Sequence, residues 1–205
     1  KPYNALIRNQ IVPLLFNNAV TGKNVSLVVR KADMLKALNV IHGQIFGISK
    51  KINLAIVGIG NVGGTLLNQI LESTDKIATR KGISLRVFAL ANSKRLLLDH
   101  NGIGQGWEGR LKSVPNGYNV SDIVDYAKAH HLENLVMVDN TASSEFVSHY
   151  LDFVKNGFDL VSSNKIANTL KYDYYRQLRD TLHRFQKQYL YETNVGAGLP
   201  LIDTI

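Results

Sequence analysis

A complete G-x-G-x-x-G pattern spans Gly58 to Gly63 and directly follows an apolar run from Ile52 to Val57. Leucine and isoleucine then recur at helical spacing, so the sequence predicts a strand, a glycine turn and a helix without a gap. In such a turn the first glycine allows a tight bend, the second admits a pyrophosphate, and the third lets the helix approach its strand. The helix N-terminus adds free N–H groups. We therefore predict dinucleotide binding, against the alternative of a turn without a ligand, by Gly58, Ile59, Gly60, Asn61, Val62 and Gly63.

The second predicted strand, residues 85–90, leads into a polar and basic turn from Ala91 to Arg95. An NAD-type fold usually carries Asp or Glu at this strand end, where it binds the ribose 2′-hydroxyl. Here Ser93, Lys94 and Arg95 offer a hydroxyl, an ammonium and a guanidinium, which suit a 2′-phosphate. The turn therefore favours NADP(H) over NAD(H), with a solvated basic turn as the alternative.

Two further strand ends carry groups capable of chemistry. Lys165 follows the predicted strand 158–161, where it could hold a carbonyl or alkoxide oxygen and pass a proton. A lysine at the surface is the alternative. Glu192 ends the predicted strand 189–192 and precedes a glycine-rich turn. A carboxylate beside backbone carbonyls can hold a hard cation, although a plain strand-to-helix turn would have the same sequence.

Strands and helices alternate over residues 51–205, which predicts an α/β fold: a Rossmann-type doubly wound parallel sheet. In such sheets, ligands bind beyond the carboxyl ends of the strands, where the residues above lie. Residues 1–50 are predicted to be a separate helix-strand-helix piece with a linker. The expected strands are 25–29, 85–90, 135–138, 158–161 and 189–192. The expected helices are 5–16, 32–46, 120–131 with a cap at Ser121 or Asp122, one from Ser143 or Ser144 to Lys155, and 172–186. Residues 101–118 are expected to be irregular.

The composition excludes several classes of function. The chain has 205 residues and no Cys, which rules out disulfides, thiolate metal sites and a thiol nucleophile. Its net charge is +8, but the basic residues are scattered without a basic stripe, so nucleic acid is not an expected partner. No apolar run approaches the roughly 20 residues of a membrane span, so a membrane is not expected either. A cytoplasmic protein fits these features best.

Taken together, six motifs resemble the homoserine dehydrogenase family, and more narrowly the form fused behind an aspartate kinase. They are GIGNVGG, ANSK, VDNTAS, SSNKIAN, the YYRQLR helix and YETNVGAGLP, in this order along the chain. Residues 1–46 resemble the end of the kinase's regulatory region, an ACT-like strand and helix that lead into the dehydrogenase. The ordered run of motifs is much more specific than the glycine pattern alone.

The resemblance implies a reaction and a set of roles. The family reduces aspartate 4-semialdehyde to homoserine with NADPH or NADH, on the route to threonine and methionine, and the full-length protein is expected to be a homo-oligomer. The glycine turn would hold the pyrophosphate, and Lys165 would both bind the cofactor and serve as the catalytic lysine. The other implied roles place the adenosine ribose near Ala91, Asn92, Ser93 and Lys94, the nicotinamide side near Thr141, and a structural sodium ion at Glu192 with the carbonyls of Val195, Ala197 and Leu199.

In one respect the chain departs from the family pattern. The carboxylates and second lysine that grip homoserine in the family lie further along, in a substrate and dimerisation domain, whereas this sequence stops at Ile205. We therefore expect a chain cut at both ends, which binds cofactor but does not oxidise homoserine on its own. The alternatives are another NAD(P)-dependent alcohol dehydrogenase and a non-catalytic dinucleotide-sensing module. Aldehyde oxidation through a thiohemiacetal would need a Cys nucleophile.

Overall fold

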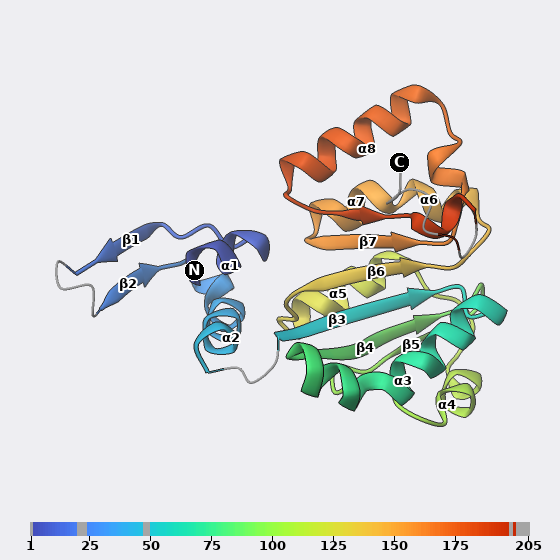
Figure 1. The fold of residues 1–205 in the computed structure, drawn as a ribbon, viewed down its shortest axis with the longest axis horizontal. Helices are drawn as coiled ribbons and strands as arrows, with labels where there is room; N and C mark the ends of the chain where they lie inside the picture. The colour runs from blue at the N-terminus through green and yellow to red at the C-terminus, as the bar shows by residue number, and fades with distance from the viewer. Residues whose placement is uncertain (1, 20–23, 47–49, 197–198, 200–205) are drawn as a thin grey trace.

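A computed structural model describes the chain except for residues 1, 20–23, 47–49, 197–198 and 200–205 (Figure 1). The main body is built on a six-stranded sheet with the order β5-β4-β3-β6-β7-β8. Neighbouring strands run parallel except at β5, which pairs antiparallel with β4 at the edge. The predicted Rossmann-type sheet is confirmed, with an antiparallel edge strand added. The strands are β3 (Lys50–Val57), β4 (Ile83–Ala91), β5 (Leu96–Leu98), β6 (Leu135–Asp139), β7 (Phe158–Ser162) and β8 (Tyr189–Leu190).

Helices cover both faces of the sheet, which explains why its central strand is apolar on both sides. In β3, Leu54 and Ile56 belong to one buried cluster, whereas Ala55 and Val57 belong to the other. The face of Leu54 and Ile56 is covered by α3 (Asn61–Lys81) and α4 (Trp107–Ser113). The face of Ala55 and Val57 is covered by α5 (Ser121–Ala129), α6 (Ser144–Ser148), α7 (Tyr150–Lys155) and α8 (Tyr172–Arg184) (Figure 1).

No helix among the described residues is long and apolar enough to cross a membrane.

The strand register brings four strand ends to the same level. Val57, the last residue of β3, is paired with Ala91 of β4 on one side and with Asp139 of β6 on the other. Asp139 is paired in turn with Ser162, the last residue of β7. The turns that follow these strands therefore begin side by side at the carboxyl edge of the sheet, where open α/β sheets bind their ligands.

Several predicted elements are wrong in their extent. Within the stretch predicted to be irregular, α4 forms and buries Trp107 and Leu111, which lie one helical turn apart. The predicted helix that ends at Lys155 is divided into α6 and α7 at His149, which closes the first helix and precedes the second. The strand predicted over 189–192 ends at Leu190, and a 3-10 turn (Glu192–Asn194) follows it. β5 lies where no strand is predicted.

The start of α5 also differs from the prediction. The residue before the helix is Val120, and it makes no side-chain cap. The Oδ2 atom of Asp122 instead accepts a hydrogen bond from the Asn119 N–H, at 2.9 Å. The predicted cap at Ser121 or Asp122 is therefore wrong, because the carboxylate binds the backbone ahead of the helix.

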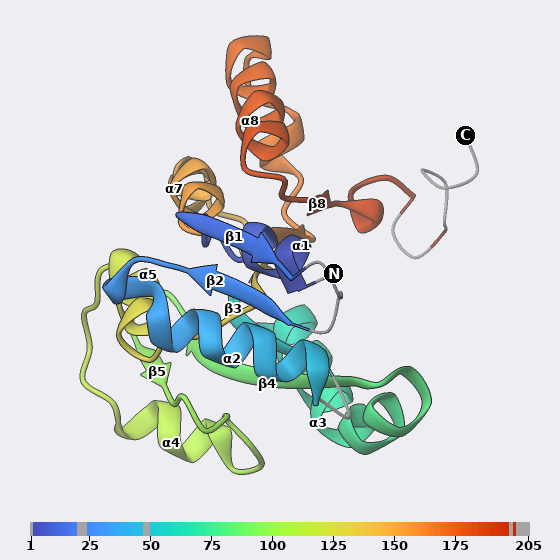
Figure 2. The same cartoon turned by 90° about the vertical axis from the view of Figure 1, so that its left-hand side faces the viewer.

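Residues 2–46, apart from 20–23, form a small N-terminal unit. The helix predicted over 5–16 ends at Arg8, because Leu15 and Phe16 pair with a second strand and form an antiparallel ribbon. Figures 1 and 2 show the unit at the amino-terminal edge of the main sheet, opposite the carboxyl ends of the strands. Its ACT-like character and the domain division at residue 50 stay predictions. The unit contains α1 (Pro2–Arg8), β1 (Leu15–Asn18), β2 (Val25–Val28), a 3-10 turn (Lys31–Asp33) and α2 (Met34–Ile45).

Candidate cofactor-binding site

A cleft of about 980 Å³ opens at the carboxyl edge of the sheet. Turns that follow β3, β4 and β6 line it, as the strand register requires. Its volume is suited to a large organic ligand rather than to an ion. The cleft brings together these sequence-predicted residues: Gly58, Ile59, Gly60, Asn92, Ser93, Lys94 and Thr141.

A side chain at each of the three motif glycines would meet a different environment. Gly58 has a φ of +86°, and a Cβ atom there would lie 2.6 Å from the backbone nitrogen of Thr141. A Cβ atom at Gly63 would collide with the carbonyl oxygen of Gly58. A Cβ atom at Gly60 would meet nothing within 4 Å in the described structure, although Gly60 lines the cleft. The fold therefore needs the first and third glycines, whereas the second leaves space that a ligand can fill.

The first turn of α3 begins beside the cleft, where its backbone N–H groups could bind an anion. The helix begins at Asn61 after Gly60, which makes no side-chain cap. The first N–H groups of an α-helix have no partner within the helix and lie at the positive end of its dipole. Asn61 and Val62 are exposed on this turn, and Gly63 is buried beneath them. Phosphate oxygens placed at Gly60 would accept hydrogen bonds from this helix end.

The turn after β4 is held in one shape by its own side chains. The Oδ1 atom of Asn92 accepts hydrogen bonds from the N–H groups of Lys94 and Arg95, both at 2.8 Å. The hydroxyl of Tyr118 donates to the Asn92 carbonyl at 2.9 Å, and burial raises the pKa of this phenol. Ser93 and Lys94 are exposed and line the cleft, whereas Arg95 is half-buried and is not among its described lining residues. Ala91, at the end of β4, is fully buried, so it contributes backbone alone.

A buried polar network supports the turns after β6 and β7. The side-chain nitrogen of Asn164 donates to Asp139 Oδ2 at 3.1 Å, to the Ser143 carbonyl at 3.1 Å and to Thr141 Oγ1 at 3.3 Å. The Oδ1 atom of Asp139 accepts from the Thr141 N–H at 2.7 Å. Asn164 and Asp139 are 3% and 1% exposed. The network therefore joins the predicted nicotinamide-side residue Thr141 to the residue that precedes Lys165.

Tyr150 joins this network from the buried core. Its hydroxyl lies 2.6 Å from Asp139 Oδ2 and 2.9 Å from Ser162 Oγ, and its side chain is fully buried. Burial, and then the negative charge of Asp139, raise the pKa of Tyr150 far above its usual range. The phenol therefore stays protonated and donates to the carboxylate. Asp139 is a structural acid in this arrangement, not a group exposed to a substrate.

Lys165 lies at the same edge of the sheet but outside the cleft's described lining. It directly follows Asn164 and precedes a short 3-10 turn (Ile166–Asn168). Its side chain is exposed, and its ammonium makes no hydrogen bond or ion pair with any residue that the structure describes. The backbone of the lysine is thus held in place, whereas its ammonium contacts no polar group of the described residues.

Sequence reasoning missed the wall of the cleft that faces the glycine turn. This wall comes from the loop before α5 and from α6, and it includes Tyr118, Glu145, Phe146 and His149. Nothing in the local sequence distinguishes these side chains from ordinary surface and core residues. Their positions at the cleft depend on tertiary contacts, such as the one that brings Tyr118 to Asn92.

The comparison with known families decides the class of this site. Residues 58–192, which begin at the first motif glycine, match a family model described as "Homoserine dehydrogenase, NAD binding domain". The chain belongs to the homoserine dehydrogenase family. The match covers its dinucleotide-binding domain, so the cleft at the carboxyl edge is the cleft of a nucleotide-binding fold.

Curated relatives of this homoserine dehydrogenase domain are much longer than the chain. The bifunctional aspartokinase/homoserine dehydrogenase of Buchnera aphidicola is 39% identical over 100% of the chain and 25% of its own length. The protein of the same name from Haemophilus influenzae is 34% identical over 99% of the chain and 25% of its own length. The chain therefore spans about a quarter of the length of these relatives.

Solved homoserine dehydrogenases have the same fold. A hyperthermophilic archaeal enzyme in complex with NADPH gives a TM-score of 0.61 at 23% identity, over 76% of this chain and 48% of that one. The enzyme of Thermoplasma acidophilum gives 0.57 at 21% identity, over 76% and 47%. At these identities the likeness supports the fold alone.

The stretch predicted to bind sodium in this homoserine dehydrogenase domain is described in part. Glu192 begins the 3-10 turn after β8, and Val195 and Leu199 are exposed beyond it. Ala197 lies outside the described residues. Asn194 donates to the Asn164 carbonyl at 3.2 Å, while its own buried Oδ1 has no hydrogen-bond partner among the described residues. The stretch thus reaches the Asn164 network and keeps one acceptor unsatisfied.

Proposed function

We propose that the chain is the cofactor-binding part of an enzyme that reduces aspartate 4-semialdehyde to homoserine, in a bifunctional aspartokinase/homoserine dehydrogenase. The observation that carries the proposal is the family match over residues 58–192, together with a cleft formed by the matched turns. Such a protein would supply homoserine for threonine and methionine synthesis. Its homo-oligomeric state and cytoplasmic location stay predictions from the resemblance and the composition.

The proposed cofactor is NADP(H) in preference to NAD(H). When bound, the nicotinamide supplies or accepts the hydride. Gly60 and the N-terminal turn of α3 would receive the pyrophosphate, since a Cβ atom at Gly60 would meet no protein atom there. Ser93 and Lys94 would bind the 2′-phosphate, because both are exposed at the cleft on a turn fixed by Asn92. The turn contains no Asp or Glu that could accept a hydrogen bond from a ribose 2′-hydroxyl.

Lys165 is proposed as the residue that holds the substrate oxygen and moves its proton. Reduction of an aldehyde leaves an alkoxide, which a neighbouring ammonium stabilises and protonates. The hydrogen bonds of Asn164 fix the backbone at Lys165, while the exposed side chain of Lys165 can reach a substrate. Its position at the carboxyl edge of the sheet, outside the cofactor-cleft lining, leaves it accessible to a substrate.

Glu192 and the carbonyls of Val195, Ala197 and Leu199 are proposed to bind a sodium ion. The donors are all oxygens, as a hard cation requires. The ion would stabilise the segment that contacts the Asn164 carbonyl, and so would act on the position of Lys165 indirectly.

The experiment uses the full-length protein and this chain side by side. NADPH and NADH are titrated into each by fluorescence, and homoserine oxidation with NADP is followed by absorbance. We expect both to bind NADPH, and only the full-length protein to turn over, because orientation of the two reactants accounts for about 7–11 kcal/mol of a barrier. A full-length protein that binds NADPH but leaves homoserine untouched would instead be a dinucleotide sensor. Oxidation of other alcohols alone would assign it to another dehydrogenase class.

A further inference from the structure

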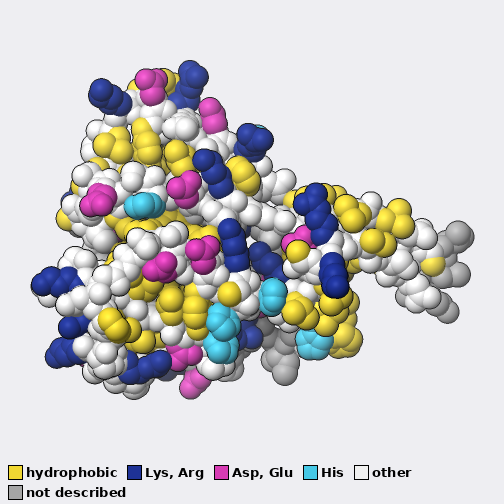
Figure 3. Space-filling model, turned by 180° about the vertical axis from the view of Figure 1, so that it is seen from behind, with side chains coloured by type: hydrophobic (Ala, Val, Ile, Leu, Met, Phe, Trp, Pro, Cys, Tyr) yellow, Lys and Arg dark blue, Asp and Glu magenta, His cyan; other side chains and the backbone are white. Residues whose placement is uncertain are grey.

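A second cleft, the junction cleft, lies between the N-terminal unit and the main body. It has a volume of about 330 Å³ and is lined by residues of α1 and α2 on one side and of β3, β4 and the segment before β6 on the other. Figure 3 shows histidine side chains grouped where the two parts meet, beside lysine or arginine. The described linings of this cleft and the cofactor cleft have no residue in common.

The lining of the junction cleft is strongly basic. Lys50 and Lys51 come from the start of β3, and Arg86 comes from β4. Glu133 is the one acidic residue in the described lining. None of the three cations forms an ion pair with any residue that the structure describes. Four of the six histidines of the chain also line the cleft: His42, His100, His130 and His131.

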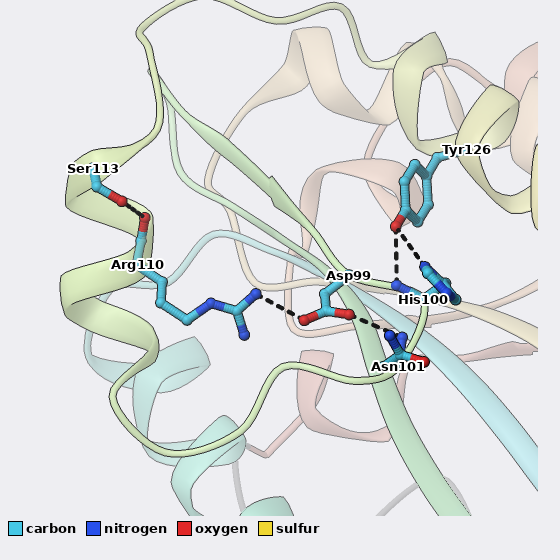
Figure 4. A network of polar contacts seen from close by, with 6 residues as sticks. All are labelled: Asp99, His100, Asn101, Arg110, Ser113 and Tyr126. Carbon is cyan, nitrogen blue, oxygen red and sulfur yellow. Dashed lines mark hydrogen bonds and ion pairs between the residues drawn. The ribbon is translucent and has the colours of Figure 1, made fainter.

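One wall of the junction cleft is fixed by contacts around His100. The backbone N–H of His100 donates to the Tyr126 hydroxyl at 3.0 Å, and its Nδ1 lies 3.3 Å from the same oxygen (Figure 4). The ring of His130 stacks on that of His100, with centroids 4.2 Å apart. Arg86 Nη1 donates to the His100 carbonyl at 2.7 Å. The guanidinium and both imidazoles are thus held in place before any ligand arrives.

Two asparagines hold the opposite sides of the junction cleft together. Asn134 donates its N–H to Asn9 Oδ1 at 2.7 Å, and Asn9 Nδ2 lies 3.3 Å from Asn134 Oδ1. The side-chain nitrogen of Asn134 also donates to the Lys51 carbonyl at 2.8 Å. Asn9 is 5% exposed, so the contact is shielded from water. The cleft is therefore preformed, as small-molecule sites usually are.

The chemistry of the lining selects the kind of ligand. Within the described residues, no three His, Cys, Asp or Glu side chains are placed to hold a metal ion. The carbonyls near the end of α5 already accept hydrogen bonds from the N–H groups of residues 130–132, so they offer little to a cation. Ammonium and guanidinium groups that form no ion pair with a described residue, with imidazole nitrogens beside them, suit oxygen anions.

We infer that the junction cleft binds a small molecule carrying two or more negatively charged oxygens, in the form of a phosphate or a dicarboxylate. Arg86 and Lys51 provide the charge, and the fixed histidine wall provides hydrogen-bond donors and acceptors. Because the ligand contacts both the N-terminal unit and the main body, its binding also stabilises their contact. The site is independent of the proposed enzymatic reaction and lies at the other end of β3.

Histidine imidazole signals in NMR spectra of the chain give a direct test, because each of the six histidines reports one place. Inorganic phosphate is added at constant pH and constant ionic strength, with sodium chloride as the matched salt. We expect the signals of His42, His100, His130 and His131 to shift together, with a Kd of about 1 mM or tighter. His149 reports the cofactor cleft and His183, on α8, serves as the distant reference. Single His→Gln variants assign the signals.

Variants and a second anion complete the test. Lys51→Gln and Arg86→Gln should each weaken phosphate binding about tenfold, the effect of losing one charge-assisted contact. Lys112→Gln removes an exposed cation of α4 outside the cleft and should change nothing. Succinate in place of phosphate tells which anion binds more tightly, and either order supports the site. Shifts of His149 alone, no shifts at all, or unchanged affinity in Lys51→Gln would overturn the inference, whether or not NADPH binds.

Discussion

The side-chain nitrogen of Asn164 lies 3.1 Å from Oδ2 of Asp139, and the pair joins the loop after β7 to the end of β6. Both side chains are almost completely buried. The same Asn164 precedes Lys165, so a hydrogen bond below the surface fixes the backbone of an exposed lysine. This relationship makes Asn164 a positioning residue whose effect can be separated from that of the lysine.

Asn164→Ala is expected to lower turnover of the full-length enzyme and to destabilise it by about 1–3 kcal/mol, because Asp139 loses a buried donor. Tyr150→Phe is the comparison variant, since it removes the other side-chain donor to Asp139 and reaches the loop of Lys165 only indirectly, through Ser162. Both variants should unfold at lower urea concentrations than the unsubstituted protein. Turnover should fall much further in Asn164→Ala, and equal losses in the two variants would contradict a positioning role.

Gly60→Ala and Gly63→Ala should separate binding from folding. Gly60 has φ −73°, which alanine adopts, and its Cβ would meet no protein atom, so stability should change by less than about 1 kcal/mol. NADPH affinity should nevertheless fall about tenfold or more, because the methyl group occupies the pyrophosphate position. Gly63→Ala should instead destabilise the fold by about 1–3 kcal/mol or more, since its Cβ collides with the Gly58 carbonyl. Urea unfolding and calorimetric titration measure the two effects.

Lys94→Ala should reduce the preference for NADPH over NADH. A charge-assisted contact to a phosphate contributes about 1.5–3 kcal/mol, so NADPH affinity should fall about tenfold or more while NADH affinity stays nearly constant. Arg95→Ala should have the smaller effect, because Arg95 is half-buried and outside the cleft lining. Calorimetry with both cofactors checks this, with Lys112→Ala as the control. Equal affinities of the unsubstituted protein for the two cofactors would show that the turn does not select a phosphate.

Lys165→Ala should lower turnover of the full-length enzyme about 10²–10⁴-fold, the usual contribution of a positioned acid. NADPH affinity should be almost unchanged, since Lys165 does not line the cofactor cleft. Lys171→Ala, an exposed lysine six residues later, provides the control. Steady-state kinetics and a fluorescence titration decide the matter, and near-normal turnover would make Lys165 an ordinary surface residue.

The sequence predicts the parts of the site that depend on local geometry. The glycine turn, the order of strands and helices, and the turns at the strand ends all follow from spacing and from the backbone freedom of glycine. The predictions fail where a long-range contact decides. Leu15 and Phe16 form a strand instead of the expected helix because they pair with β2. Trp107 lies in a helix that the sequence does not predict, because it packs into the buried cluster beside α3. Glu145 and His149 reach the cleft by tertiary packing, which no local pattern records.

β3 connects the two clefts as one covalent element. Lys50 and Lys51 line the junction cleft at its start, and Gly58 lines the cofactor cleft just after its end, about eight residues or roughly 26 Å away. The strand is hydrogen-bonded to β4 on one edge and to β6 on the other, so it cannot slide without breaking both ladders of hydrogen bonds. A displacement of the N-terminal unit would therefore reach the glycine turn through the sheet as a whole rather than through β3 alone.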